Sequence, residues 1–332
     1  MLGSEFVSTY GRKGLNAWEP AAIMLASDGK LTPWPFVDLP LSDGANTVIL
    51  RVQSDVLAIG SLEDHLRLPL TTAAAQGIAN LGGMLLTTPW IEYQLWRHAS
   101  VKLQPTAMVP NQGANMEQYA AHSRIIDEQI RAAGGRAGEL VAGIKKGVVV
   151  ANFYKRARVL LFGWYRAFLT DAAGQPIGAP DVFDDGKPMI TNGVQTPNRQ
   201  PIQPRSNIHD ENYLDYSHGI RLVGPIAIVN GQAMPTIDVY VHPVYGKIVN
   251  LDPTRPDYSG ALKVPRYPTS IPPAPPAAMS TVFMSGGPFR ASAPGPIARV
   301  PIVYPNVPDA PSEPSAMEHA LDELSRRRHG GF

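Results

Sequence analysis

The distribution of proline constrains the fold of this sequence more than any other feature. The chain of 332 residues contains 33 prolines, and they are dense from Tyr267 to Pro314. Proline fixes φ and lacks a backbone N–H, so the run Pro272-Pro273-Ala274-Pro275-Pro276 favours polyproline II over helix or sheet. The sequence therefore predicts a globular core over residues 1–265 and an extended Pro-rich arm over residues 266–314.

A short amphipathic helix and tail are predicted for residues 315–332. Ser315 and Glu318 form the S-x-x-E pattern of a capping box. An apolar stripe follows at helical spacing, made of Met317, Ala320, Leu321 and Leu324. A helix of this length is too short to be stable alone in water. We therefore expect the stripe to be an interface that docks on a neighbouring subunit.

The core is predicted to be α+β. Helical patterns with cap signals, such as Thr88-Pro89 and Asn115, precede residue 135, and strand patterns dominate after residue 145. The predicted helices cover residues 17–26, 71–81, 88–99 and 115–133. The predicted strands cover 47–59, as a pair, and then 147–153, 158–164, 220–229 and 236–242. This order favours N-terminal helices (about 17–135) packed on a mainly antiparallel β-sheet (about 145–250) over alternating βαβ units.

Composition and charge exclude several classes of function. The chain has no cysteine, which excludes disulfides, thiolate catalysis and Cys-based metal sites. The net charge is +1 and Lys and Arg form no long basic stripe, so no specific nucleic-acid or membrane binding is predicted. Residues 1–19 lack the apolar stretch of a signal peptide, and no apolar run approaches the length of a transmembrane segment. We expect the protein in a virion or in the host cytoplasm.

Residues 206–221 are the richest part of the chain in groups that bind metals or move protons. Neutral imidazoles and a carboxylate are ordinary zinc ligands, so His209, Asp215 and His218 are candidate metal ligands with an open position for water. Glu211 or Asp210 would then be the general base. The alternative interpretation is a hydrogen-bonded polar turn that leads into the strand 220–229.

Other polar and aromatic residues are expected to be structural. Lys145 and Lys146 precede a predicted strand, where two lysines are typical of a solvated edge. His65 lies in a predicted turn. Trp90 and Trp96 fit the core face of a helix better than a platform for stacking a ligand.

One long block, Tyr213-Leu214-Asp215-Tyr216-Ser217-His218-Gly219-Ile220-Arg221-Leu222-Val223, resembles a group of uncharacterised bacterial proteins. The resemblance spans roughly residues 55–223 and implies no reaction, because the group has no established activity. The group's pattern has Gly-His-Lys-Lys-Asp where this chain has Gly143-Ile144-Lys145-Lys146-Gly147, and Gly-Trp-His where it has Gly163-Trp164-Tyr165. Two histidines and an aspartate are thus absent. If relatives are hydrolases, the resemblance implies a disarmed copy that serves as a scaffold.

Two functions follow from these observations. The first is a non-catalytic structural or assembly protein of a large particle, with a phage virion as the first expectation. Its partners would be copies of itself and other particle subunits, bound through the C-terminal arm, and no cofactor is expected. The alternative is a metal-dependent hydrolase of bacterial cell-wall peptide or glycan that uses zinc at His209, Asp215 and His218. A carbohydrate-binding module is a third possibility.

Overall fold

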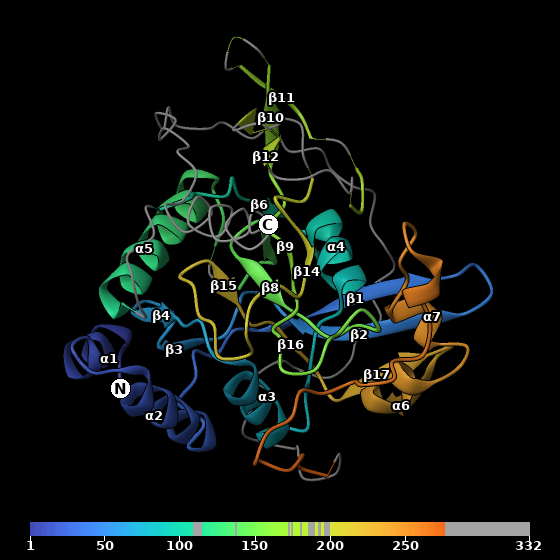
Figure 1. Cartoon of the computed structure of the whole chain (residues 1–332), viewed down its shortest axis with the longest axis horizontal. Helices are drawn as coiled ribbons and strands as arrows, with labels where there is room; N and C mark the ends of the chain where they lie inside the picture. The colour runs from blue at the N-terminus through green and yellow to red at the C-terminus, as the bar shows by residue number, and fades with distance from the viewer. Residues whose placement is uncertain are drawn as a thin grey trace, which may run out of the picture.

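The computed structural model describes residues 1–108, 115–136, 138–171, 173, 175–179, 181–184, 190–191, 194–195 and 200–275. In this part the chain has an α+β fold with seven α-helices and a mainly antiparallel sheet, as predicted (Figure 1). The arm beyond residue 275 and the terminal helix, with its stripe of Met317, Ala320, Leu321 and Leu324, lie outside the described residues.

Most helices precede residue 135, and all of these but α1 lie where the sequence predicted a helix. They are α1 (Gly3–Tyr10), α2 (Leu15–Ser27), α3 (Thr72–Leu81), α4 (Pro89–His98) and α5 (Met116–Ala132). The predicted caps are present: the hydroxyls of Thr71 and Thr88 accept hydrogen bonds from the first turns of α3 and α4, and Asn115 caps α5 in the same way. Among the described residues, none of the helices combines the length and apolar character needed to cross a bilayer.

The main sheet has six strands in the order β18-β17-β2-β16-β5, with β1 also paired to β2. Its strands are β1 (Phe36–Ser42), β2 (Thr47–Gln53), β5 (Leu85–Leu86), β16 (Leu222–Val223), β17 (Ile226–Val229) and β18 (Gln232–Pro235). All the pairs are antiparallel. The sheet thus combines strands from residues 36–86 with strands from residues 222–235, whereas the sequence placed it within 145–250.

A second sheet carries the residues that matter for the site. It has the order β14-β9-β8-β15, from strands β8 (Lys146–Val148), β9 (Leu161–Gly163), β14 (Gln203–Ser206) and β15 (His218–Gly219). Strands β15 and β8 are parallel, so His218 lies opposite Lys146 and Gly219 opposite Gly147. The remaining strands pair two by two: β3 (Ala58–Gly60) with β4 (His65–Arg67), β6 (Val101–Lys102) with β7 (Val141–Ala142), β10 (Phe168–Thr170) with β11 (Pro176–Gly178), and β12 (Ile190–Thr191) with β13 (Val194–Gln195).

The strand predicted over residues 236–242 is wrong, because this segment forms helix α6 (Thr236–Val241). Its β-branched residues favoured a strand, but Thr236, Val239 and Tyr240 are the buried positions, and a spacing of three and four residues fits a helix. Helix α7 (Gly246–Val249) and a 3₁₀ turn (Pro256–Tyr258) follow. In Figure 1, α6 and α7 lie on the opposite side of the molecule from α1, α2 and α5.

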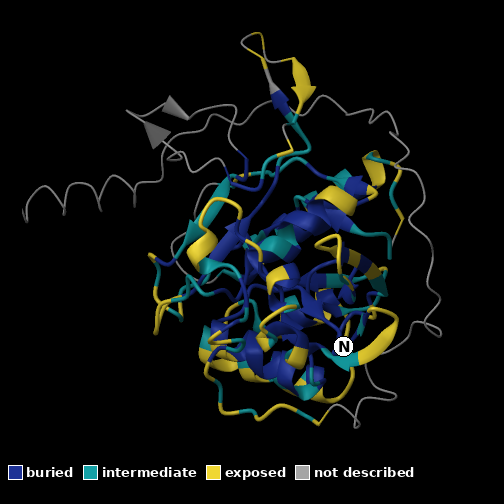
Figure 2. Ribbon diagram, turned by 90° about the vertical axis from the view of Figure 1, so that its right-hand side faces the viewer, coloured by how far each residue is buried: buried dark blue, intermediate teal, exposed yellow. Residues whose placement is uncertain are grey.

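The core fills the space between the helices and the main sheet. Figure 2 shows buried residues running through the centre of the molecule and exposed residues at its periphery. Strand β2 illustrates the packing, since Val48, Leu50 and Val52 are fully buried. A smaller aromatic cluster, with Tyr93 and Trp96 of α4 packed on Tyr165, forms a second core. Trp96 is buried there, in agreement with its predicted place in a helix core.

Residues 266–275, here called the anchor segment, lie against α3. Tyr267 is buried; its hydroxyl donates to the carbonyl of Val149 at 2.7 Å, and its backbone N–H donates to Gln76 at 3.2 Å. Asn80 donates from Nδ2 to the carbonyl of Ile271 at 2.6 Å and accepts from Arg266 at 2.5 Å. The start of the predicted Pro-rich arm is therefore fixed to the core.

Candidate functional site

The polar segment before β15 forms a compact turn. The ring of His209 stacks on Tyr213 with centroids 4.0 Å apart, and Tyr213 contacts His218 edge to face at 5.5 Å. The carboxylate of Asp215 accepts hydrogen bonds from the N–H and the hydroxyl of Ser217, both at 2.7 Å. The three predicted metal ligands thus belong to one turn, with the Tyr213 ring in contact with both imidazoles. Within the described residues, no three His, Cys, Asp or Glu side chains form a group able to hold a metal ion.

The two candidate bases take part in the same turn. The carboxylate of Asp210 accepts from the backbone N–H and the side-chain amide of Asn212, both at 3.0 Å, which is an Asx turn. Glu211 is joined to α3 through its backbone carbonyl, which accepts from the N–H of Thr72 at 3.3 Å. These contacts are those of the hydrogen-bonded polar turn that the sequence left as the alternative.

His218 is fully buried, and neither ring nitrogen has a hydrogen-bond partner in the part of the chain that the structure describes. Burial lowers the pKa of His218 to about 3, so the ring is neutral. Burial alone would raise the pKa of Asp215, but Lys146, His218 and the Ser217 donors outweigh it and hold this pKa at about 2.

Lys145 is buried, which corrects the prediction that it forms part of a solvated edge. Its ammonium group donates to the carbonyl of Tyr216 and lies 3.3 Å from Nδ1 of His122. Burial, helped by the positive charge of Arg67, lowers the pKa of Lys145 to about 7. Burial also lowers the pKa of His122 to about 2. A lysine that is partly neutral at neutral pH is the kind of group that enzymes use as a base or nucleophile.

A small cavity lies beside Lys145, between α4 and strands β8, β9 and β15. Glu92 and Arg221 contribute the other charged side chains of its wall, and Ile144, Gly147 and Tyr165 line it as well. These last three are the positions that the resemblance expected from the sequence marks as departures from that group's pattern. In the sequence, only that resemblance relates these three positions to one another. In the fold they line the same cavity. Sequence analysis did not identify Glu92 or Arg221 as site residues. The local signal at each is only a charged residue within an otherwise apolar stretch.

The charged groups of this wall are held by neighbouring groups of the fold. Arg221 donates from its two terminal nitrogens to the carbonyls of Gln53 and Val141, both at 2.7 Å. Glu92 accepts from the hydroxyl of Thr87 at 2.6 Å. Burial raises the pKa of Glu92, against the opposing effect of Arg221 and Thr87.

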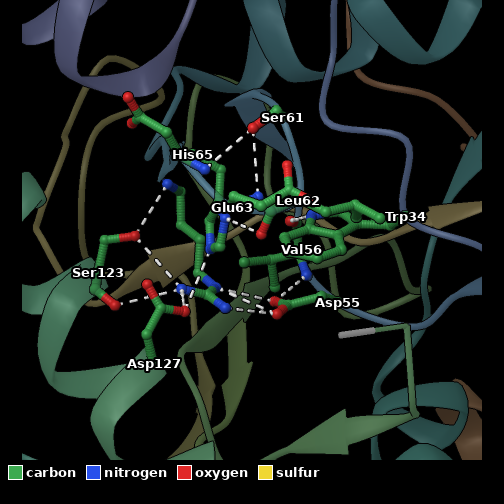
Figure 3. Close-up of polar contacts among 11 residues, drawn as sticks. Trp34, Asp55, Val56, Ser61, Leu62, Glu63, His65, Ser123 and Asp127 are labelled. Carbon is green, nitrogen blue, oxygen red and sulfur yellow. Dashed lines mark hydrogen bonds and ion pairs between the residues drawn. The ribbon is translucent and has the colours of Figure 1, made fainter. Parts of the chain in front are cut away.

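A second buried ionic cluster surrounds Arg67 (Figure 3). Arg67 pairs with Asp55 and Asp127, and its Nη1 also donates to the carbonyl of Ser123 at 3.2 Å. His65 lies 3.1 Å from Asp127 through Nε2 and 3.2 Å from the carbonyl of Leu62 through Nδ1. Each nitrogen of the Arg67 guanidinium donates to a partner within the fold, and both ring nitrogens of His65 lie near such partners, so these contacts join separate segments of the chain.

Comparison with known proteins adds no relative, since no family model, no curated protein and no solved structure matches the chain.

Proposed function

We propose that this chain is a non-catalytic structural protein of a large particle, a phage virion component, and that its C-terminal arm binds neighbouring subunits. The anchor segment is the observation that carries this proposal. Through Tyr267 and Ile271 the first residues of the arm are tied to α3 and to Val149, which follows β8. An arm that binds a neighbouring subunit can hold the two subunits together only if its first residues are fixed to its own core. The contacts of the anchor segment meet this requirement.

The state of the polar residues supports the non-catalytic part of the proposal. At three positions of the cavity beside Lys145 the chain carries Ile144, Gly147 and Tyr165. Ile144 and Gly147 cannot transfer a proton, and burial raises the pKa of Tyr165 well above its ordinary value, so these positions give Lys145 no second acid–base group that works near neutral pH. Arg221 and Asp215 are occupied by bonds within the fold. These bonds hold backbone segments in place, which is the role expected of polar residues in a structural protein.

The experiment replaces the apolar stripe of the terminal helix in the full-length chain. Leu321→Asp with Leu324→Asp places two charges on the predicted contact face, so we expect assembly to be lost while the core keeps its unfolding transition. Sedimentation and electron microscopy would measure assembly, and chemical denaturation would measure the core.

The matched control is Ser315→Asp with His319→Asp. It adds the same two carboxylates to the same helix but leaves the stripe unchanged, and Asp is as good an N-cap as Ser. We expect this variant to assemble like the parent chain. Normal assembly of the Leu321→Asp, Leu324→Asp variant would refute the arm's role, as would a parent chain that stays monomeric under all assembly conditions.

One observation favours the hydrolase as the second candidate. Both ring nitrogens of His218, near the ionised Asp215, lack a hydrogen-bond partner among the described residues, and a metal ion would bond one of them. Metal analysis of protein purified without chelator tests this function. Stoichiometric zinc that is lost in His209→Ala would support the hydrolase and oppose our proposal, whereas metal-free protein that folds normally would leave the hydrolase without its cofactor.

A further inference from the structure

The wall of the cavity beside Lys145 includes several glycines. Its volume is about 20 Å³, and its lining includes Gly143, Gly147, Gly163 and Gly219. A Cβ atom on Gly147 would lie 3.1 Å from the side chain of Glu92, and one on Gly219 would lie 2.8 Å from Cβ of Lys145. Side chains at these positions would close the space. The cavity has room for about one water-sized group.

Three residues of the lining carry a buried N–H donor that has no acceptor among the described residues. The donors are Nε of Arg221 and the indole Nε1 of Trp96 and Trp164. Arg221 is 3% exposed and the two tryptophans are each 6% exposed, so solvent does not satisfy these donors. Leaving one buried donor unpaired costs on the order of 1–3 kcal/mol, and three such donors on residues that line one cavity indicate a missing acceptor.

The charge of the wall indicates what this acceptor is. Arg221 is a cation, and Lys145 adds a second positive charge whenever it is protonated. Glu92 is the one carboxyl group among the described residues of the lining, and burial raises its pKa, which favours its uncharged form. A water molecule would bring two donors of its own that need acceptors, whereas an anion only accepts. An excess of donors with positive charge therefore fits an anion better than water.

We propose that this cavity binds a single small inorganic anion of halide size, held by the N–H donors of Arg221, Trp96 and Trp164. The site is independent of the arm and goes beyond the proposed function, because it requires neither a partner subunit nor a reaction. In the cell, chloride is the anion of this class.

The test measures thermal unfolding of the full-length chain in sodium bromide, with sodium gluconate at equal ionic strength and pH as the reference. A ligand that binds only the folded state raises the melting temperature with its concentration. Gluconate is too large for the cavity, so we expect bromide, and not gluconate, to raise the melting temperature. An equal effect of the two salts would overturn the proposal and leave water as the occupant.

Variants locate the binding site. Trp164→Phe removes one donor and keeps an aromatic side chain, so halide affinity should fall by roughly tenfold. Trp96→Phe tests the same point if Trp164→Phe does not fold. Trp18→Phe is the matched control, because Trp18 also has a buried, unpaired indole N–H but does not line the cavity. A bromide effect that the cavity variants leave unchanged, or that Trp18→Phe weakens equally, would place the ion elsewhere and refute the assignment.

Discussion

Arg67 and Asp55 form a two-point ion pair inside the fold. Nε of Arg67 donates to Oδ1 of Asp55 at 3.1 Å and Nη2 donates to Oδ2 at 2.7 Å, and the two side chains are 1% and 3% exposed. Arg67 belongs to β4, Asp55 follows β2, and Asp127 on α5 accepts from the same guanidinium at 2.7 Å. One side chain thus joins three separate elements, and its removal leaves the buried Asp55 carboxylate without its hydrogen-bonded cation.

Arg67→Met is expected to destabilise the protein by about 3–5 kcal/mol, because Asp55 would remain buried without its partner. The matched control is Arg97→Met. Arg97 pairs with Asp181 at 3.1 Å, but these side chains are 43% and 55% exposed, so the loss should stay within about 1 kcal/mol. Urea denaturation measures both free energies. Similar losses in the two variants would contradict a structural role of the buried pair.

Acid should destabilise the protein well above the pH at which carboxylates titrate. Burial lowers the pKa of His122 to about 2 and of His218 to about 3, while histidine in the unfolded chain titrates near 6.5. As pH falls from about 6.5 to 3, the unfolded chain binds protons that the folded chain excludes. The free energy of unfolding therefore falls by about 1.4 kcal/mol per pH unit for each histidine.

Denaturant titrations between pH 7 and pH 4 measure how the free energy of unfolding changes with pH in the parent chain and in two variants. His218→Phe should reduce this pH dependence of the free energy of unfolding by the contribution of one histidine, about 1.4 kcal/mol per pH unit. His98→Gln, at an exposed histidine, should leave it unchanged. An unaltered slope in His218→Phe would mean that His218 is protonated in the folded protein as easily as in the unfolded one.

Gly143→Ala should destabilise the protein more than Gly44→Ala, although both glycines have a positive φ, of 81° and 91°. A Cβ on Gly143 would lie 2.3 Å from the carbonyl oxygen of Leu103, whereas nothing lies within 4 Å of a Cβ on Gly44. Gly44→Ala therefore carries only the strain of the left-handed backbone, about 1–2 kcal/mol. Chemical denaturation of the two variants separates strain from collision, and equal losses would argue against the close approach at Gly143.

Asn80→Ala should release the anchor segment. It removes the donor to the Ile271 carbonyl and the acceptor for Arg266, so we expect a loss of about 1–3 kcal/mol and faster proteolysis within residues 266–275. Asn212→Ala, at an exposed asparagine, is the control. Limited proteolysis followed by mass spectrometry identifies the cut sites. Cleavage at the rate of the parent chain would mean that other contacts hold the segment.

The helices were predictable because their signals are local. Thr88 with Pro89, and Asn115 before its apolar stripe, specify helix starts within one turn of chain. The pairing of β2 with β17 was not predictable, since it depends on contacts between residues far apart in the chain. Helix α6 was missed for a related reason: tertiary packing of Val239 and Tyr240 overrides the β propensity of the segment.

The candidate site was predictable only in part. A polar turn was one of the two interpretations that the sequence offered for the segment around Asp215, whose contacts with Ser217 are local. The burial of Lys145 was not, because a lysine next to a strand is normally exposed and its partners, His122 and Tyr216, come from distant segments. The cavity wall combines residues 92, 145 and 221, and no local pattern connects them.

The position of β2 in the main sheet has a consequence for synthesis of the chain. One edge of β2 pairs with β1 at once, but the other edge pairs with β16 and β17, which leave the ribosome about 170 residues later. At typical translation rates this apolar strand edge stays open for about 10–35 s. Open edges pair readily with other chains. During that interval the exposed edge of β2 can pair with another unfolded chain. We therefore expect the risk of aggregation to be greatest before β16 and β17 have been synthesised.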